Sequence, residues 1–261
     1  MSDWKHFLNS LPIAAFEAFD EVGSTNDVAM EWVHNGAEDR SLVIADRQTQ
    51  GRGRMGRSWQ TTADASLAFS YILKPNPREI PYTSFFSPLG ALAVCEVIMT
   101  YDLQAEIKWP NDVLLNRKKV AGILSEIVWI NDTIEAIVIG IGVNIATESI
   151  PDKDSVLFPA SSVAAETGKI IDRMQFLADT LAQLDSWRLS INSPTFFDEW
   201  NRCLAFKGEQ VKIQPVAGVP VIGTLVGINP FGAILIRDTA GVTQSFLAGD
   251  VHLRPVSDNL E

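Results

Sequence analysis

The feature that most restricts the fold of this chain is a series of strand-like stretches separated only by short turns. The stretches are NDVLL (111–115), VAGILSEIVW (120–129) and IEAIVIGIGVNI (134–145). Parallel strands need a crossover connection of about a dozen residues, whereas antiparallel strands can be joined by a tight turn. The sequence therefore predicts an antiparallel or mixed sheet rather than βαβ winding.

The remaining elements predict an α+β fold in which helices back this sheet. Short apolar stretches at 41–46 and 66–73 are typical of strands, and the longer apolar run at 84–101 predicts a buried helix. Residues 146–160 are polar, contain two prolines and predict a long loop. Residues 161–191 are predicted to be mostly helical, with Ser161 or Ser162 as the cap.

The pattern changes at Lys207-Gly208-Glu209. Beyond this point about five short strand-like stretches alternate with Gly/Pro turns, which predicts a small β-barrel. We therefore expect two domains, residues 1–206 and 207–261. The first strand-like signal comes at residue 41, and this favours a chain without a separate N-terminal DNA-binding module.

Composition excludes several classes of function. The formal net charge of −11 argues against general nucleic-acid binding, which needs a basic field. Cys95 and Cys203 form no CxxC pair and are expected to be buried, reduced thiols. The N-terminus carries no secretory signal, and no apolar run approaches the ~18 residues of a membrane helix. These features favour a cytoplasmic protein with no membrane contact.

The segment RQTQGRGRMGRSW (47–59) carries the strongest chemical signal. Its glycines permit close approach of the backbone to a ligand, and its arginines supply fixed donors for phosphate or carboxylate. The segment predicts a loop that closes over an anion. An exposed basic turn or an RNA-contacting segment remains the alternative, and the Walker A pattern GxxxxGK[ST] is absent.

Three further motifs are ambiguous when each is taken alone. KWPNDVLLNRKKVAGILSE (108–126) offers lysines for phosphates and an aspartate for Mg²⁺, or only a charged hairpin. Ser24-Thr25-Asn26 offers neutral hydrogen-bonding groups, or only a helix cap. GIGVN (140–144) ends an apolar strand, and a β-bulge is the simpler interpretation.

Together and in this order, the motifs STN, QTQGRGRMGRSW, KWPND, KKVAGILSE and GIGVNI resemble those of the biotin–protein ligase family. The resemblance covers residues 24–144, and the stretch ending in GDVHLRP looks like the family's SH3-like domain. It implies a class II synthetase-like mixed sheet followed by that small barrel. It also implies an ATP-dependent ligase, in a form lacking an N-terminal DNA-binding domain.

The resemblance implies a reaction in two steps. The biotin carboxylate first attacks the α-phosphate of ATP to give biotinyl-5′-AMP and pyrophosphate, and an acceptor lysine then displaces AMP. The implied requirements are biotin, ATP and Mg²⁺, with no prosthetic group. The implied partner is a biotin carboxyl carrier protein, such as that of acetyl-CoA carboxylase. Family members include monomers and dimers, so a homodimer remains open.

The resemblance also assigns roles to individual residues. It places Lys119 and Arg54 as the catalytic cations, and Asp112 as the residue near a Mg²⁺ held through the phosphates. It implies biotin binding by Ser24, Thr25, Asn26, Gln48, Gly51, Arg52, Gly53, Arg54, Lys119 and Gly122. It implies ATP binding by Arg57, Trp59, Lys108, Asn111, Asp112, Lys119 and Asn144.

The sequence departs from the family pattern at two points. Met55 stands where some members carry another arginine. The loop at 146–160 has no tryptophan to stack on adenine, and Phe158 is the candidate substitute. Arg254, in the expected terminal strand, is a further candidate to approach the nucleotide.

Three other functions compete with this interpretation. A lipoate–protein ligase shares the fold, but GRGRxGR together with KWPND favours biotin. A biotin-responsive transcriptional regulator would need a DNA-binding module and a basic field. An RNA-binding module would need aromatic platforms near the loop, where Trp59 stands almost alone.

Overall fold

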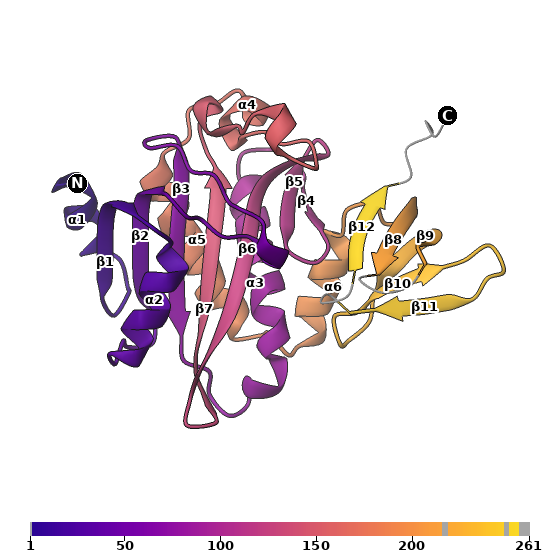
Figure 1. Cartoon of the computed structure of the whole chain (residues 1–261), viewed down its shortest axis with the longest axis horizontal. Coiled ribbons are helices and arrows are strands. Elements are labelled where there is room, and N and C mark those ends of the chain that lie inside the picture. Colours follow the sequence, from indigo (N-terminus) through magenta and orange to yellow (C-terminus); the bar gives the residue numbers. More distant parts are fainter. Residues whose placement is uncertain (1, 216–218, 248–250, 256–261) are drawn as a thin grey trace.

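The computed structural model describes residues 2–215, 219–247 and 251–255, which form a seven-stranded mixed sheet and a five-stranded antiparallel sheet (Figure 1). The strand order of the larger sheet is β1-β2-β3-β7-β6-β5-β4. Only β1 and β2 pair in parallel, and the other neighbours are antiparallel. The predicted α+β class is therefore confirmed. The strands are β1 (Phe16–Val22), β2 (Ser41–Gln48), β3 (Ser66–Leu73), β4 (Ala105–Lys108), β5 (Asp112–Leu115), β6 (Lys118–Ile130) and β7 (Thr133–Asn144).

Helices cover both faces of this sheet, as Figure 1 shows. One face receives helix α2, and the other receives α3, against which α5 packs. The α-helices are α1 (Ser2–Leu8), α2 (Thr25–His34), α3 (Phe86–Met99), α4 (Val163–Thr167), α5 (Arg173–Arg188) and α6 (Pro194–Arg202). Short 3-10 turns add η1 (Arg54–Gly56), η2 (Ile80–Phe85), η3 (Thr147–Ser149) and η4 (Lys153–Ser155).

The two faces follow from the alternation of side chains along each strand. Leu42 and Ile44 of β2 belong to the large core cluster that also contains the buried residues of α3 and α5, whereas Val43 lies with Ala29 and Val33 of α2. Successive residues of a strand point to opposite faces, so a strand apolar at every position must be covered on both. All eight residues of β3 are buried, which explains why its limits match the predicted 66–73.

Other elements differ from the sequence-based expectation. The first strand is β1 at residue 16, not at residue 41, and α1 precedes it. The mostly helical stretch expected over 161–191 consists of α4 and α5, which are separate because Gly168 adopts a left-handed φ of 67° and ends α4. The loop at 146–160 is present and contains the single turns η3 and η4.

The expectation that no apolar run approaches the length of a membrane helix is wrong for the stretch that contains α3. The helical stretch Ile80–Met99 has a mean hydropathy of 1.4 and is long and apolar enough to span a bilayer. Its apolar window is 67% buried inside the protein, where it packs against β6, β4 and α5. The apolar character of this stretch is therefore explained by its burial as a core helix.

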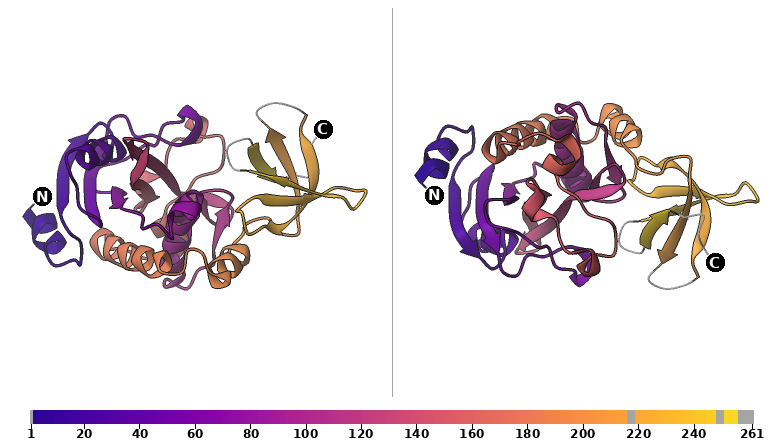
Figure 2. Two further views of the ribbon diagram at one scale, coloured as in Figure 1. Left: turned by 90° about the horizontal axis from the view of Figure 1, so that it is seen from below. Right: turned by 90° about the horizontal axis from the view of Figure 1, so that it is seen from above.

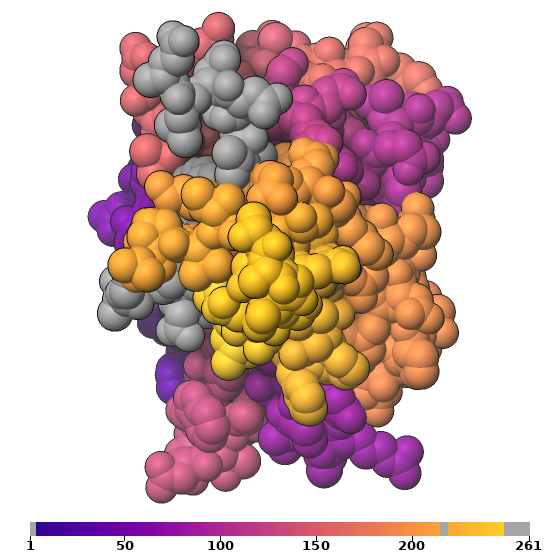
Figure 3. All heavy atoms as spheres, turned by 90° about the vertical axis from the view of Figure 1, so that its right-hand side faces the viewer, coloured from indigo at the N-terminus to yellow at the C-terminus, as the bar shows by residue number. Residues whose placement is uncertain are grey.

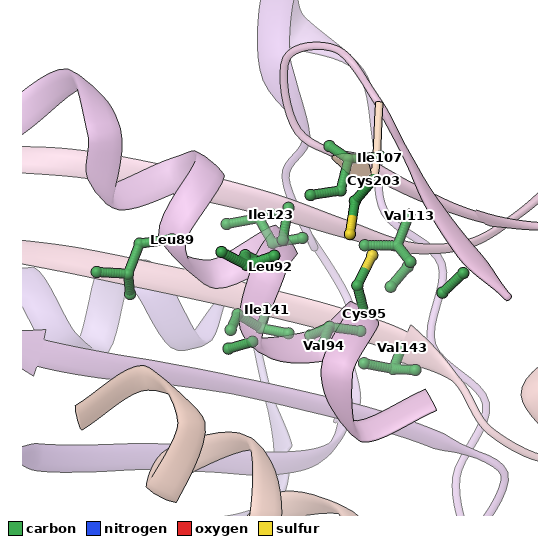
Figure 4. Close-up of a cluster of buried hydrophobic side chains, with 14 of the residues drawn as sticks. Leu89, Leu92, Val94, Cys95, Ile107, Val113, Ile123, Ile141, Val143 and Cys203 are labelled. Atoms are coloured by element: carbon green, nitrogen blue, oxygen red, sulfur yellow. The ribbon is translucent and has the colours of Figure 1, made fainter. Parts of the chain in front are cut away.

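Both cysteines are free and buried, as expected from their apolar surroundings. Their sulfur atoms point toward one another from α3 and from the end of α6, among Ile107, Val113 and Ile123 (Figure 4). Burial raises the pKa of the Cys95 thiol and raises that of Cys203 to about 11. Thiols with a raised pKa are poor nucleophiles, so packing is the role of this pair.

The smaller sheet has the strand order β11-β10-β9-β8-β12 and agrees with the SH3-like domain that the resemblance implied. Its strands are β8 (Gln210–Pro215), β9 (Val221–Ile228), β10 (Ile234–Arg237), β11 (Thr243–Phe246) and β12 (Val251–Pro255). It lies at the end of the molecule opposite the N-terminus (Figure 2) and projects toward the viewer in Figure 3.

Specific contacts join the two sheets. The indole Nε1 of Trp109 donates to the carbonyl oxygen of Gly232 at 3.1 Å. The Arg117 guanidinium pairs with both carboxylate oxygens of Glu209, with one N–O distance of 3.0 Å. Trp109 belongs to the KWPND motif, so this motif directly contacts the C-terminal sheet. A domain boundary near residue 206 remains our proposal.

Candidate active site

A cavity of about 480 Å³ lies on the α2 face of the large sheet. Helix α2 covers only part of that face, and the uncovered part carries small side chains from β3, β6 and β7. The loop of residues 49–59, here called the glycine–arginine loop, lies over this hollow. Of the residues in the expected biotin-binding and ATP-binding sets, all but Gly51 line the cavity: Ser24, Thr25, Asn26, Gln48, Arg52, Gly53, Arg54, Arg57, Trp59, Lys108, Asn111, Asp112, Lys119, Gly122 and Asn144.

One end of the cavity presents neutral hydrogen-bonding groups. Ser24 stands at the N-cap position of α2, but its side chain makes no capping hydrogen bond and is 3% exposed at the cavity wall. The backbone N–H and the hydroxyl of Thr25 lie 2.8 and 3.1 Å from Gln48 Oε1, to which both donate. The simple helix-cap explanation for Ser24 therefore does not apply, and its hydroxyl lies at the cavity.

Asn26 is held on all sides by the protein. Its amide nitrogen donates to Glu126 Oε2 at 2.7 Å and to the Leu124 carbonyl at 3.3 Å. Its Oδ1 accepts from the hydroxyl of Ser70 on β3, at 2.6 Å. Ser70 was missed from the sequence because a single serine in an apolar strand carries no recognisable pattern. These contacts hold the first turn of α2 against the sheet.

The floor of the cavity is made of strand glycines. A Cβ on Gly142 would lie 2.3 Å from the Trp59 indole, and one on Gly140 would lie 2.1 Å from Asn26 Oδ1. Gly122 pairs with Gly142 across β6 and β7, and its added Cβ would meet Lys119 and Trp59 at 3.1–3.2 Å. No register shift occurs at these glycines, so their spacing reflects close approach of side chains rather than a bulge.

The glycine–arginine loop is fastened to the sheet by its arginines. Arg52 donates to both carboxylate oxygens of Glu126, at 2.9 and 2.7 Å, and to Asp27 Oδ1 at 2.7 Å. Arg54 lies 3.4 Å from Asn111 Oδ1, and burial lowers the pKa of its guanidinium. Gly51 lines no part of the cavity, but it allows the loop to close, since a Cβ there would lie 2.4 Å from the Trp59 carbonyl.

The other end of the cavity is cationic. Asp112 accepts from Lys119 Nζ at 2.6 Å and from Lys108 Nζ at 3.4 Å. Burial alone would raise the pKa of Asp112, but the two lysines lower it below its ordinary value of 3.8. Two lysines against one carboxylate leave net positive charge in a partly buried site, which suits a phosphate or carboxylate ligand.

This lysine–aspartate group leads to a prediction about stability. Asp112→Asn should destabilise the protein by about 3 kcal/mol at neutral pH, because two partly buried ammonium groups lose their shared counter-charge. Since the folded-state pKa of Asp112 is lowered, its contribution is present above 3.8 and is lost as the pH falls through the lower folded value. Urea unfolding between neutral pH and pH ~3 should therefore show the gap between wild type and variant closing.

The exposed residue Asp102, which pairs with Lys169, provides the control for this measurement. Its side chain is 92% exposed, and Asp102→Asn should leave the free energy of unfolding nearly unchanged. A difference between wild type and Asp112→Asn that stays constant down to low pH would contradict the assigned role of this carboxylate.

The loop at 146–160 borders the same cationic end. The backbone N–H of Lys119 donates to the Pro159 carbonyl at 2.7 Å, and Asn144 Nδ2 donates to the Ser161 carbonyl at 3.0 Å. Phe158 lines the cavity with its ring centroid 5.1 Å from Lys108 Nζ. The loop and the lysines are thereby fixed relative to one another. The Arg254 side chain lies outside the described residues.

The carboxylates of this site do not fit a metal ion held by the chain itself. Both oxygens of Asp112 are engaged by lysines, and Glu126 is engaged by Arg52. Within residues 2–215, 219–247 and 251–255, no group of three or more His, Cys, Asp or Glu side chains could hold a metal. The donor set thus does not favour Asp112 as a direct Mg²⁺ ligand.

Two family models match the chain. Residues 18–144 match the model of the biotin/lipoate A/B protein ligase family, and residues 207–254 match that of the biotin protein ligase C terminal domain. The first match contains the cavity residues of α2, the glycine–arginine loop, β5, β6 and β7. The second coincides with the five-stranded sheet.

Individual relatives extend these matches over most of the chain. The bifunctional ligase/repressor BirA of Bacillus spizizenii is 31% identical over 240 residues, covering 90% of this chain and 72% of that protein. The biotin–[acetyl-CoA-carboxylase] ligase of Mycobacterium tuberculosis is 31% identical over 242 residues, covering 90% and 87%. The structure of biotin protein ligase from Aquifex aeolicus in complex with biotin and ATP is similar with a TM-score of 0.76, at 28% identity, covering 93% and 100%.

Proposed function

This chain belongs to the biotin protein ligase family, and on that premise we propose that it activates biotin with ATP and transfers it to an acceptor protein. The activity is that of a biotin–[acetyl-CoA-carboxylase] ligase. The observation that carries the proposal is the single cavity with neutral hydrogen-bonding groups at one end and lysines at the other. Its volume of about 480 Å³ falls in the usual range for small-molecule sites.

The neutral end suits the ureido ring of biotin, which carries no charge. The Ser24 hydroxyl at the wall and the amide of Gln48, held by Thr25, supply hydrogen-bonding groups there. The indole of Trp59, which lies against Gly122 and Gly142 of the glycine floor, supplies an apolar surface for the aliphatic chain of biotin. The biotin carboxylate would then point toward Lys119.

The first chemical step joins two anions and therefore depends on cations. A carboxylate oxygen of biotin forms a bond to the α-phosphorus of ATP, and the bond to the β-phosphate oxygen breaks, releasing pyrophosphate. Lys119 offsets the charge that accumulates at the α-phosphate, with Arg54 and Lys108 nearby. Magnesium enters this proposal only with the ATP phosphates, because the carboxylates of the site are engaged by the chain's own cations.

The second step transfers biotin to a protein. The amine nitrogen of an acceptor lysine attacks the carbonyl carbon of the mixed anhydride, the bond to AMP breaks, and the amine gives up a proton. The acceptor is a biotin carboxyl carrier protein, or the corresponding domain of a carboxylase. Positioning and electrostatics account for most of the rate in both steps, of which only the first is a reaction at phosphorus.

The direct test is incubation of the purified chain with biotin, MgATP and a biotin-acceptor domain, followed by avidin detection of the acceptor. Biotin-dependent exchange between ATP and pyrophosphate reports the first step separately. Transfer and exchange are both expected. The proposal would be overturned if neither occurs.

Lipoate is the second candidate substrate, because the family model over residues 18–144 spans biotin and lipoate ligases. The match of residues 207–254 to the biotin protein ligase C terminal domain favours biotin. Lipoate added in excess should therefore leave biotin-dependent exchange unchanged. Lipoate-dependent exchange would instead indicate that lipoate is the substrate. The proposal does not include the repressor activity named for the BirA relatives, because the net charge of −11 opposes DNA contact.

Arg54 should keep the activated intermediate in the site. Arg54→Gly removes a half-buried guanidinium from the glycine–arginine loop and lets water or foreign lysines reach the mixed anhydride. We expect the variant to biotinylate bulk proteins such as serum albumin, which wild type leaves unlabelled, detected by avidin blot. Labelling confined to the acceptor domain would contradict this role.

A further inference from the structure

Glu126 lies where helix α2, strand β6 and the glycine–arginine loop meet. Its Oε2 accepts from Asn26 and from Arg52, each at 2.7 Å, and its Oε1 accepts from Arg52 at 2.9 Å. We infer that Glu126 is a positioning residue that keeps the glycine–arginine loop closed over the biotin end of the cavity. The inference rests on the proposed function and names the side chain that retains the intermediate.

The geometry of the Arg52–Glu126 pair supports this role. A bidentate pair between guanidinium and carboxylate fixes orientation as well as distance, which a single contact does not. Glu126 is anchored in β6, an interior strand paired on both sides, whereas Arg52 belongs to a loop. The pair therefore holds the loop in a fixed position relative to the sheet. Asp27, at 2.7 Å from Arg52, adds a contact from α2.

The negative charge of Glu126 also supports a positioning role. A carboxylate beside a cavity for anionic substrates would repel them unless a cation neutralised it. Arg52 supplies that cation, so the two side chains cancel within the protein. Burial would lower the pKa of Arg52, but Glu126 and Asp27 raise it. Arg52 is thereby assigned to loop closure rather than to direct charge compensation of the substrate.

Glu126 also links the loop to biotin recognition. The contacts run from Ser70 to Asn26, then to Glu126 and Arg52, so one carboxylate orders both α2 and the loop. Lys108, Asp112 and Lys119 are held by their own ion pairs at the other end of the cavity. Loss of Glu126 should therefore weaken the retention of biotin and of its adenylate. The KM for ATP should stay nearly unchanged.

The test compares Glu126→Gln, Arg52→Ala and the double variant with wild type. The readouts are the rate at which preformed radiolabelled biotinyl-5′-AMP leaves the enzyme, and the KM values for biotin and ATP in pyrophosphate exchange. Glu126→Gln should release the adenylate about tenfold faster and raise the KM for biotin, with the KM for ATP within about twofold. If both residues act through one contact, the double variant should release it no faster than Arg52→Ala.

Two further variants keep the test decisive. Glu135→Gln, which removes a carboxylate paired with Lys74 on the same sheet, should behave as wild type. Arg52→Lys retains the charge but not the two-point contact, so it should also release the adenylate faster even where Glu126→Gln does not fold. Wild-type retention in Glu126→Gln and Arg52→Lys, or additive effects in the double variant, would overturn the inference. Wild-type protein without biotin-dependent exchange would instead overturn the proposed function, and the inference with it.

Discussion

Lys119→Ala should lower biotin-dependent ATP–pyrophosphate exchange by about 100-fold to 1,000-fold, the usual effect of removing one preorganised group that stabilises transition-state charge. Lys119 is held 2.6 Å from Asp112 and lines the cavity, so its ammonium group is oriented before substrates arrive. Truncation removes this charge where the carboxylate and the α-phosphate must approach each other. The loss should fall mainly on kcat.

The neighbouring residue Lys118 offers a matched control. It lies on the same strand, but its ammonium group pairs with Glu166 at 2.9 Å and its side chain is 48% exposed. Lys118→Ala should retain exchange within about twofold, as expected for loss of an exposed ion pair. Equal losses in both variants would indicate a general structural defect, and full activity of Lys119→Ala would refute its assigned role.

Gly142→Val should raise the Kd for biotin by about 100-fold, because small misplacements within a site carry effects of that size. A Cβ at this position would lie 2.3 Å from the Trp59 indole, so the ring must leave the glycine floor. Valine is well suited to a strand, so the sheet should persist. Isothermal titration with biotin would measure the loss, and an unchanged thermal transition would separate it from unfolding.

Gly23→Ala is the control for this substitution. Gly23 lies next to Ser24, and an added Cβ there meets nothing within 4 Å. Biotin affinity should therefore be unchanged in this variant. Wild-type affinity in Gly142→Val would mean that biotin and Trp59 do not occupy the floor formed by Gly122 and Gly142.

Several elements could be predicted because the sequence pattern and the burial agree. β3 is apolar at every position and buried at every position, and the turns at Asn116-Arg117 and Asn131-Asp132 adopt the left-handed φ values that tight hairpins need. β1 could not be predicted, because FEAFDEV is an acidic edge strand with no clear alternation. Residues 161–191 were expected to be mostly helical, but the point where α4 ends could not be predicted, because a single glycine in the sequence does not indicate a left-handed φ.

The motifs establish the chemical types at the site: neutral groups in STN, arginines among glycines, and lysines around KWPND. Which of these side chains pair with one another depends on the three-dimensional fold. Arg52 lines the cavity, and the fold also pairs it with Glu126, which lies 74 positions along the chain. Ser70 reaches Asn26 because β3 and β7 place it opposite Gly140, where no side chain intervenes. Motifs report residue types at fixed spacing, whereas strand register and the absence of a Cβ determine which side chains meet.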